Sequence, residues 1–437
     1  MKLPMKMQKL VLLIPALLAA LAISCCNAAA APVRMQLTHV DAGRGLSGRE
    51  LMHRMAMRSK ARAPRLLSGS ATAPVSPAPD ADGGPGTRRV QLTFDTGSDL
   101  TWTQCLPCPL CFEQSLPYFD GSRSSTHALL PCDSTQCQSL QVVSCGKKYW
   151  SNQSCVYIYT YGDKSVTVGH LDVETITFGD GAGADTSRRA SMPGVAFGCG
   201  LVNHGTYGIA GTGLAGFGRG PLSLPSQLKL DNFSYCLTAA MTGSKPSTIL
   251  LDLPADLYSH GCSAVQTTPL IKNPRNPTPY YLSLKGITVG SKRLPVPESV
   301  FALKNGTGGT VIDSGTSIMW LPPSVYRLVR EAFLAHVKLP VVPSNGTGPL
   351  LCFSAPPRGK PYVPKLVLHF EGATMHLPRE NYVFEVDDDA GNRNICLAIT
   401  EGDEMTIIGN FQQQNMHVLY DLKNSKLSFV HAQCDKL

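Results

Sequence analysis

One short acidic motif occurs twice in the chain, and this repeat constrains the fold more than any other feature of the sequence. Each copy places an aspartate directly after an apolar segment, followed by a small hydroxyl residue, a glycine and a second hydroxyl residue. Glycine allows the tight turn that such a motif needs at the end of a strand. A lone copy would most often be an ordinary turn, but one copy in each half indicates an internal duplication. The copies are Asp95, Thr96, Gly97 and Ser98 and, 218 residues further on, Asp313, Ser314, Gly315 and Thr316.

The rest of the chain predicts a mostly β protein with few helices. Charged residues make up only 16%, too few for a coiled coil, and 40 glycines and 33 prolines interrupt the chain at short intervals. One helix is expected after Pro322, because apolar residues recur at helical spacing from Val325 to Val337. A Ser/Thr/Pro-rich stretch near residues 241–248 is the candidate boundary between the halves. Strands are expected at residues 90–94, 156–161, 171–178, 280–289, 309–312, 366–370, 395–399, 416–420 and 427–430.

Residues 1–31 have the three-part pattern of a secretory signal peptide. Three lysines precede an apolar run from Leu10 to Ser24, and small residues follow from Asn27 to Ala31. The run is shorter than the roughly 20 residues that cross a bilayer. An uncleaved anchor or a transit peptide shares part of this pattern, but the absence of acidic residues favours secretion. No other stretch is apolar enough to span a membrane, so a soluble mature protein in the secretory pathway is expected.

Basic residues are concentrated near the N-terminus. Of the 39 Lys and Arg residues, three lie in the leader and ten between Pro32 and Arg89, which leaves 26 for the body. The body holds 27 of the 31 Asp and Glu residues and is therefore near neutral. No run of five basic residues occurs, which argues against a nucleic-acid partner. We interpret residues 32–88 as a cationic pro-segment and linker, which covers an acidic cleft and leaves when the cleft carboxylates are protonated.

Local patterns divide this basic region into two parts. Ser47 and Glu50 match a helix capping box, and the apolar residues that follow recur at helical spacing. Residues 47–63 therefore predict a basic amphipathic helix. Residues 64–87 are rich in Ala, Pro, Ser and Gly and predict a linker. The alternative for the whole region is a disordered basic tail.

Fifteen cysteines fit a chain that passes through an oxidising compartment. Cys25 and Cys26 lie in the leader, which leaves an odd number, so one mature thiol is expected to be unpaired. Seven cysteines gather between residues 105 and 155. Their CxxC spacing also suits zinc, but no separate matched CxxC or paired histidine accompanies it, so disulfides of unspecified connectivity are preferred. Four sequons make Asn152, Asn232, Asn305 and Asn345 candidates for glycosylation.

Two aspartates presented on matched turns suit acid–base chemistry on a bound water. Two carboxyl groups a few ångströms apart cannot both ionise readily, so they share a proton. The ionised group can deprotonate water, while the protonated group can donate to a peptide carbonyl oxygen. Because the pair titrates as a unit, neither aspartate has a fixed role. The hydroxyls of Ser98 and Thr316 can hold the outer carboxylate oxygens.

Other catalytic patterns lack support in the sequence. Residues 211–216 match the dinucleotide-binding GxGxxG by letter, but no strand–helix context surrounds them and two prolines follow closely. No GxSxG nucleophile motif and no HExxH metal motif occurs. Serine hydrolases and metalloproteases are therefore not indicated.

Several further motifs accompany the two acidic turns. They are Asp-Thr-Gly-Ser-Asp-Leu-Thr-Trp-Thr-Gln-Cys at 95–105 with a cysteine-rich insert after it, Tyr-Thr-Tyr-Gly-Asp at 159–163, Phe-Gly-Cys-Gly at 197–200, Gly-Leu-Ala-Gly-Phe-Gly-Arg-Gly at 213–220, and Ile-Ile-Gly-Asn-Phe at 407–411. The basic region adds Leu-Thr-His-Val-Asp at 37–41 and Gly-Arg-Glu-Leu at 48–51. With these motifs the chain resembles the pepsin-like aspartic endopeptidases (family A1), and specifically their plant nepenthesin-type branch.

The resemblance implies a bilobal, mostly β fold with a cleft between an N-terminal lobe (residues 89–245) and a C-terminal lobe (residues 246–437). It implies that Asp95 and Asp313 are the catalytic pair. Residues 214–216 and 407–409 match the segments that support the two acidic loops. A disulfide between Cys352 and Cys396 is also implied, because these residues match a cysteine pair of the C-terminal lobe.

The resemblance further implies a flap, a β-hairpin that closes over substrate. Tyr161 matches the flap tyrosine, and Trp102 matches the tryptophan that steadies it. Independently of the family, Tyr161, Gly162 and Asp163 lie between two strand-like segments and suit a hairpin tip. Taken alone, Tyr161 would be an ordinary strand aromatic.

These features lead to the expectation of a monomeric acid endopeptidase in the apoplast or vacuole. It would act on extended peptide or protein substrates, with no cofactor, no metal, no nucleic-acid partner and no membrane partner after signal cleavage. The alternative is a non-catalytic binding protein on the same fold, like the plant xylanase-inhibitor relatives. Those relatives depart from the catalytic pattern, whereas both motifs are intact here, which favours the enzyme.

One departure from the family concerns the start of the N-terminal lobe. The family has a strand and a Gly-Thr-Pro turn ahead of the first acidic loop, but here only residues 88–94 precede Asp95. Part of the first strand pair is therefore expected to be absent. Its loss would expose a sheet edge beside the active loop, so a shortened inactive or misfolded form is a third reading.

Overall fold

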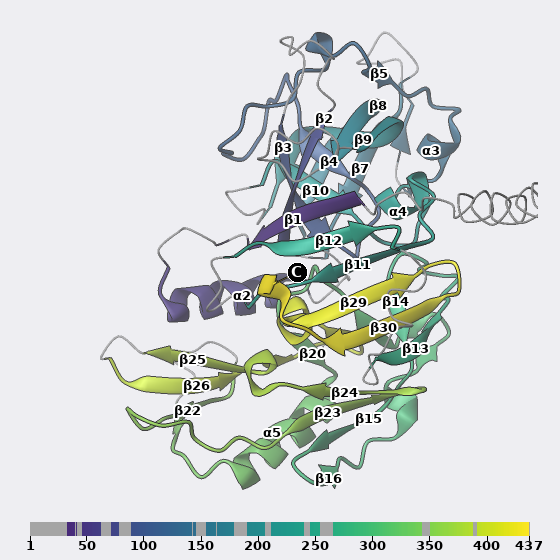
Figure 1. The fold of residues 1–437 in the computed structure, drawn as a ribbon. Helices are drawn as coiled ribbons and strands as arrows, with labels where there is room; N and C mark the ends of the chain where they lie inside the picture. The colour runs from purple at the N-terminus through teal and green to yellow at the C-terminus, as the bar shows by residue number, and fades with distance from the viewer. Residues whose placement is uncertain are drawn as a thin grey trace, which may run out of the picture.

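Two β-rich lobes lie one above the other, with a six-stranded sheet between them (Figure 1). The structure is a computed structural model. It describes residues 33–39, 41, 46–62, 71–77, 89–141, 143–145, 154–162, 164–178, 190–205, 211–239, 245–253, 265–342, 350–387 and 391–436. The leader predicted at residues 1–31 lies outside these ranges. No helix among the described residues is long and apolar enough to cross a membrane.

The N-terminal lobe is built on one sheet whose longest pair is the hairpin of β8 and β9. Burial alternates along strands such as β3, as expected for strands with one face on the core. Three short helical segments connect strands: Gly121–Arg123, α3 (Thr135–Gln138) and α4 (Leu224–Gln227). The strands are β2 (Ala71–Pro77), β3 (Val90–Asp95), β4 (Trp102–Gln104), β5 (Ala128–Leu129), β6 (Val143–Ser144), β7 (Val156–Thr160), β8 (Val166–Phe178), β9 (Ala190–His204) and β10 (Gly213–Gly216).

The C-terminal lobe holds further small sheets and helix α5 (Pro323–His336), the one long helix outside the basic region among the described residues. This helix begins where the sequence predicted it and buries Val325, Val329 and Phe333. The strands are β14 (Tyr280–Leu282), β15 (Leu284–Val289), β16 (Lys292–Arg293), β17 (Leu303–Lys304), β18 (Thr307–Gly308), β19 (Thr310–Ile312), β20 (Met319–Leu321), β21 (Val341–Val342), β22 (Cys352–Ser354), β23 (Leu366–Phe370), β24 (Ala373–Leu377), β25 (Val383–Asp387), β26 (Arg393–Leu397), β27 (Ile399–Glu401) and β28 (Thr406–Ile408). Short 3-10 turns lie at Glu298–Val300, Arg379–Asn381, Asn410–Gln413 and Cys434–Lys436.

The strands around each acidic motif have the same arrangement in both lobes. In the N-terminal lobe, β10 runs parallel to β3 and antiparallel to β4, and β4 runs parallel to β9. In the C-terminal lobe, β28 runs parallel to β19 and antiparallel to β20, and β20 runs parallel to β27. The matched topology confirms the internal duplication that the repeated motif predicts.

The six-stranded sheet joins the lobes. Its order is β1 (Val33–His39), β12 (Ser247–Leu251), β11 (Asn232–Cys236), β29 (Met416–Asp421), β30 (Lys426–His431) and β13 (Gln266–Ile271), with every pair antiparallel. Aromatic rings fill the core beside it, with Phe233 stacked on Tyr420 at a centroid distance of 4.6 Å. Strands from the beginning and the end of each half of the chain therefore meet in one sheet.

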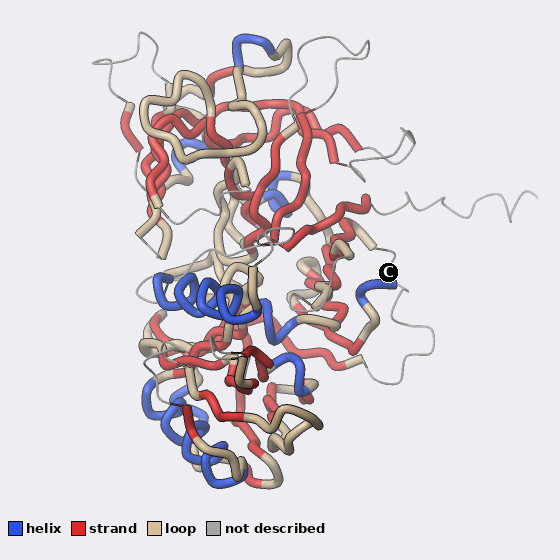
Figure 2. The backbone as a smooth tube through the Cα atoms, turned by 90° about the vertical axis from the view of Figure 1, so that its left-hand side faces the viewer, coloured by secondary structure: helices blue, strands red, loops and turns tan. Residues whose placement is uncertain are grey.

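The basic N-terminal region is packed onto the protein at two places. Strand β1 forms an edge of the six-stranded sheet and buries Met35 and Leu37. The predicted helix is confirmed as α2 (Gly48–Arg62), and its capping box is made by Ser47 and Glu50. Helix α2 lies at the left of Figure 1 and toward the viewer in Figure 2, beside the C-terminal lobe. The disordered-tail alternative is therefore wrong for these described segments.

The segment predicted as a linker contains strand β2, which is a correction. Residues 72–75 of β2 pair antiparallel with β3, and residues 76–77 pair with β8. The expectation that the edge beside the first acidic loop is left open is therefore also wrong. Composition misled the prediction, because Ala, Pro and Ser are poor strand formers, whereas strand pairing is made by backbone groups next to an available edge.

Six disulfides join all twelve cysteines among the described residues, which confirms the preferred reading of the cysteine pattern. Cys132, Cys137 and Cys145 lie close enough to suit a metal ion, but each is in a disulfide. Cys262, the remaining mature cysteine, lies outside the described residues. The bridges are Cys105–Cys199, Cys108–Cys111, Cys132–Cys145, Cys137–Cys155, Cys236–Cys434 and Cys352–Cys396.

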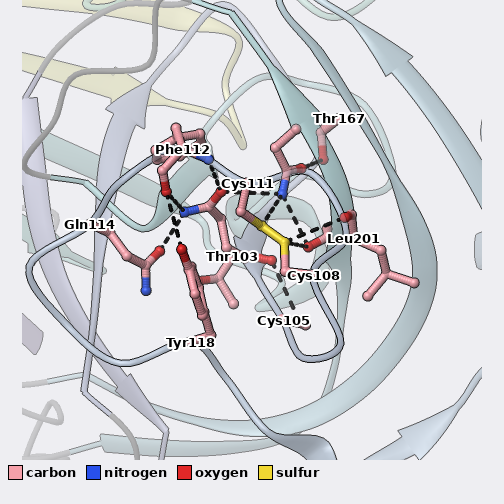
Figure 3. Close-up of a disulfide and its surroundings, with 12 residues drawn as sticks. Thr103, Cys105, Cys108, Cys111, Phe112, Gln114, Tyr118, Thr167 and Leu201 are labelled. Atoms are coloured by element: carbon pink, nitrogen blue, oxygen red, sulfur yellow. Dashed lines mark hydrogen bonds between the residues drawn. A yellow bond between two sulfur atoms is a disulfide. The ribbon is translucent and has the colours of Figure 1, made fainter.

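The cysteine-rich insert is anchored next to strand β4 (Figure 3). The side-chain amide of Gln104 accepts from the backbone N–H of Phe112 at 3.0 Å and donates to its carbonyl at 2.9 Å. The amide of Asn203 donates to the sulfur of Cys111 at 3.5 Å. The ring of Phe112 then lies edge-on to that of Trp102, at 6.3 Å between centroids. The insert thus packs against a residue that the resemblance places at the flap.

Candidate active site

The two acidic turns hold their carboxylates in the same way. The backbone N–H of Gly97 donates to Oδ1 of Asp95 at 2.9 Å, and the Ser98 hydroxyl donates to Oδ2 at 2.5 Å. In the second turn, the N–H of Gly315 donates to Oδ1 of Asp313 at 2.8 Å, and the Thr316 hydroxyl donates to Oδ2 at 2.7 Å. Both aspartates are at most 1% exposed. Each carboxylate is therefore fixed in orientation by its own loop and shielded from bulk water.

The two turns are also bonded to each other. The backbone N–H of Thr96 donates to the hydroxyl of Ser314 at 3.1 Å, and the N–H of Ser314 donates to the hydroxyl of Thr96 at 2.9 Å. These residues directly follow the two aspartates. The structure therefore brings the two predicted acidic residues to one place, at the contact between the lobes.

A buried polar network supports this contact from the six-stranded sheet. The side-chain amide of Gln413 donates to the carbonyl of Asp313 at 3.2 Å, and that of Asn410 donates to the carbonyl of Ser314 at 3.0 Å. The Tyr235 hydroxyl donates to the Gln413 side chain and lies 2.9 Å from the Tyr420 hydroxyl. Burial raises the pKa of both phenols well above the ordinary value, so both stay neutral.

Sequence reasoning missed most of this network. Asn410 falls within the motif that the resemblance identified, but Gln413, Tyr235 and Tyr420 do not. The two tyrosines have the pattern of ordinary strand aromatics. Their role depends on β11 and β29 being paired in space, although residues 235 and 420 are far apart in the chain.

The predicted flap residues lie together. The indole Nε1 of Trp102 donates to the Tyr161 hydroxyl at 2.7 Å, and both side chains are buried. A turn at residues 161–165 joins β7 to β8, with the N–H of Tyr161 donating to the carbonyl of Ser165 at 2.8 Å. Gly162 lies in this turn, and Asp163 lies outside the described residues.

An open cleft of about 680 Å³ lies beside the site, with walls from both lobes. The N-terminal lobe contributes Asp99, residues 158–160 and Leu222, and the C-terminal lobe contributes residues 275, 276, 278 and 306–308 among others. The buried aspartates are not on these walls. The cleft has both polar and apolar walls.

The other candidate residues are found in varied settings. Asn305 is exposed in the turn between β17 and β18, with a φ of 51°. The Asn232 side chain donates to the carbonyl of Leu253 at 3.2 Å and accepts from its N–H at 2.8 Å, so a glycan there would disturb these bonds. Asn152 and Asn345 lie outside the described residues. Cys352 and Cys396 form a disulfide across β22 and β26.

Comparisons with known proteins agree with this architecture. The family model described as "Xylanase inhibitor N-terminal" matches residues 81–251, and "Xylanase inhibitor C-terminal" matches residues 279–431. Aspartic proteinases nepenthesin-1 and nepenthesin-2 of Nepenthes gracilis are 42% and 39% identical to this chain. Each alignment covers 92% of this chain and 90% of the relative.

Solved structures extend the likeness of the fold. The crystal structure of edgp superimposes with a TM-score of 0.66 at 20% identity, covering 86% of this chain and 96% of that chain. Basic 7S globulin from soybean gives a TM-score of 0.64 at 20% identity, covering 91% of this chain and 96% of that chain. The bilobal fold and its paired acidic loops define the class of pepsin-like aspartic proteases. Within that class, the chain belongs to the plant nepenthesin-type family.

Proposed function

We propose that the protein is an acid endopeptidase that hydrolyses peptide bonds with a water activated by Asp95 and Asp313. The observation that carries this proposal is the pair of reciprocal hydrogen bonds between Thr96 and Ser314. These bonds fix the two acidic turns against each other, so the carboxylates face one site. Each carboxylate already accepts an N–H and an O–H, which supports a preorganised geometry.

The chemistry follows from the shared proton. The ionised carboxylate removes a proton from a bound water as the water oxygen bonds to the peptide carbonyl carbon. The protonated carboxyl donates to the carbonyl oxygen and stabilises the tetrahedral intermediate. A proton then passes to the amide nitrogen, the C–N bond breaks, and an acid and an amine are released. No covalent acyl-enzyme is formed. Because the pair titrates as a unit, neither aspartate is assigned a permanent acid or base role.

The substrate class follows from the cleft and the flap. A groove with walls from both lobes suits an extended segment of several residues, held partly through its backbone. Tyr161, oriented by Trp102, would close over this segment and exclude water from the aspartate pair. We therefore propose peptide and protein substrates, cleaved by a monomeric chain.

The N-terminal segments support synthesis as a precursor. We propose a leader at residues 1–31, a pro-segment in the basic residues that follow it, and lobes at residues 71–245, which include β2, and 246–437. Met52 and Met55 of α2 pack into an apolar cluster of the C-terminal lobe that includes Phe384 and Phe411. Apolar burial therefore holds this helix in addition to any charge attraction. Processing would occur in the secretory pathway, with the apoplast or vacuole as the destination.

The test is cleavage of a denatured protein over roughly pH 2.5 to 7 by secreted chain, with and without pepstatin. Asp95→Asn and Asp313→Asn should each abolish cleavage while the far-UV spectrum and melting temperature stay close to those of the wild type. Asp133→Asn, at an exposed position, is the matched control and should cleave normally. Cleavage retained in either active-site variant would overturn the proposed pair. Folded wild-type chain without cleavage would favour a non-catalytic binding role.

A further inference from the structure

A third carboxyl group in the first acidic loop faces the opposite lobe. Asp99 lies four residues after Asp95, and its Oδ1 accepts from the backbone N–H of Gly220 at 2.8 Å. Its Oδ2 accepts from the hydroxyl of Thr278 at 2.5 Å. Gly220 belongs to the N-terminal lobe, whereas Thr278 lies between β13 and β14, at the start of the C-terminal lobe. One side chain therefore joins the two lobes at the wall of the cleft.

Glycines at every second position from 216 to 220 leave the space that Asp99 occupies. A Cβ at Gly216 would lie 2.2 Å from the backbone oxygen of Asp99. A Cβ at Gly218 would lie 2.4 Å from Oδ1, and one at Gly220 would lie 2.0 Å from Oδ2. No side chain fits at these distances, so the glycines at positions 216, 218 and 220 are explained by the close approach of Asp99.

The same segment is bonded to the loop of Asp95 and to the other lobe. The N–H of Phe217 donates to the carbonyl of Asp95 at 2.7 Å, and the N–H of Gly218 donates to that of Ser98 at 2.8 Å. Across the junction, the N–H of Arg219 donates to the carbonyl of Thr278 at 3.0 Å. A displacement of Thr278 would therefore be passed to the first acidic loop through bonded neighbours.

The charged surroundings of Asp99 come from several elements. Burial raises the pKa of Asp99, and the bonds from Thr278 and Gly220 oppose this effect. Burial raises the pKa of Tyr159 of β7, and the charges of Asp99 and Asp95 add to this effect. The titratable and charged groups that face this region are Asp95, Tyr159, Arg219, Tyr280 and, on the same cleft wall, Arg275.

We propose that Asp99 is a positioning residue that locks Thr278 against residues 216–220 and so sets the C-terminal lobe relative to the loop of Asp95. This inference rests on the proposed function. When ionised, Asp99 also places a second negative charge in the loop of Asp95, which favours retention of the proton shared by the aspartate pair. Its two effects, on lobe position and on the titration of the pair, can be separated by substitution.

Two variants separate the effects. Asp99→Asn keeps the size and can still bond to both Thr278 and Gly220, but it has no charge. It should keep kcat within a few-fold and shift the alkaline limb of the kcat/KM profile to lower pH by about half a unit or more. Thr278→Val keeps the charge and removes the side-chain bond between the lobes. It should lower kcat/KM by about tenfold with no shift of that limb.

The control is Thr267→Val, which removes an exposed hydroxyl of the C-terminal lobe that is bonded to Ser428 and lies away from the cleft walls. An unshifted limb in Asp99→Asn, or normal kcat/KM in Thr278→Val, would overturn the inference. Hydrogen exchange of residues 216–220 and 278–280 separates this outcome from failure of the proposed function. If the folded wild type cleaves nothing, faster exchange at both segments in Thr278→Val still supports the positioning role, and unchanged exchange refutes it.

Discussion

Thr96 and Ser314 each donate a backbone N–H to the hydroxyl of the other, at 3.1 and 2.9 Å. They occupy equivalent positions in two loops that are 218 residues apart. Because both are buried, neither N–H can turn to water if its partner is removed. The relative position of the two aspartates is therefore set by two hydrogen bonds, with Gln413 and Asn410 holding the second loop from below.

Thr96→Val should weaken both folding and catalysis. The change keeps the shape of the side chain but leaves the N–H of Ser314 without its acceptor, at a cost of about 1–3 kcal/mol. Denaturant unfolding would show this loss in the free energy of unfolding, and kcat should fall more than KM rises. Ser314→Ala should behave similarly. An unchanged kcat in both variants would contradict the coupling of the loops.

Trp102→Phe should lower kcat/KM more than Trp320→Phe does, because only Trp102 is bonded to Tyr161 of the proposed flap. Each tryptophan lies seven residues beyond its aspartate, in the equivalent strands β4 and β20. The indole of Trp102 donates to Tyr161 at 2.7 Å, whereas that of Trp320 has no hydrogen-bond partner among the described residues. Both changes remove ring area, but only the first removes a hydrogen bond to the Tyr161 hydroxyl.

Steady-state kinetics of Tyr161→Phe and of the double variant with Trp102→Phe would measure this coupling. We expect a coupling energy of about 1 kcal/mol in kcat/KM for the Trp102–Tyr161 pair. Strictly additive effects would show that the bond does not position the flap.

Features that depend on local pattern could be predicted from the sequence. The acidic turns, most strands, α2 and α5 follow from turn residues, alternation and helical spacing. The paired bonds of Ser98 and Thr316 to the carboxylates also follow, because hydroxyl and acid lie within one turn. The lobes and the flap came from the resemblance, not from composition.

Features that depend on distant neighbours could not be predicted. Tyr235 and Tyr420 meet only because β11 pairs with β29, and Asp99 meets Thr278 only across the lobe junction. Strand β2 was missed because pairing to an available edge outweighed its proline-rich composition. In each case the decisive partner lies outside the local segment and leaves no periodicity in it.

His127 should stabilise the N-terminal lobe in acid. Its ring lies 3.0 Å from the carboxylate of Asp172, and this hydrogen bond raises the pKa of His127 above its ordinary value. A raised pKa means that the stabilisation is complete below about pH 6.5 and is lost as pH rises through the folded pKa. His127→Gln should therefore lower the melting temperature more at pH 5 than at pH 8.5. An equal loss at both values, or the same pattern for exposed His431→Gln, would contradict this role.

His417 should have the opposite effect on acid stability. It is buried in β29 with its Nε2 at 2.8 Å from the Ser234 hydroxyl, and burial lowers the pKa of His417 to about 4. Below about pH 6.5 the unfolded chain gains a proton that the folded chain does not, so stability falls until the pH reaches the folded pKa. The loss at pH 4 is about 3 kcal/mol, from roughly 1.36 kcal/mol for each unit of difference. His417→Gln keeps a polar partner for Ser234 without titrating, so chemical unfolding should show a gain at pH 4 and little change at pH 7.5; a gain independent of pH would instead point to improved packing.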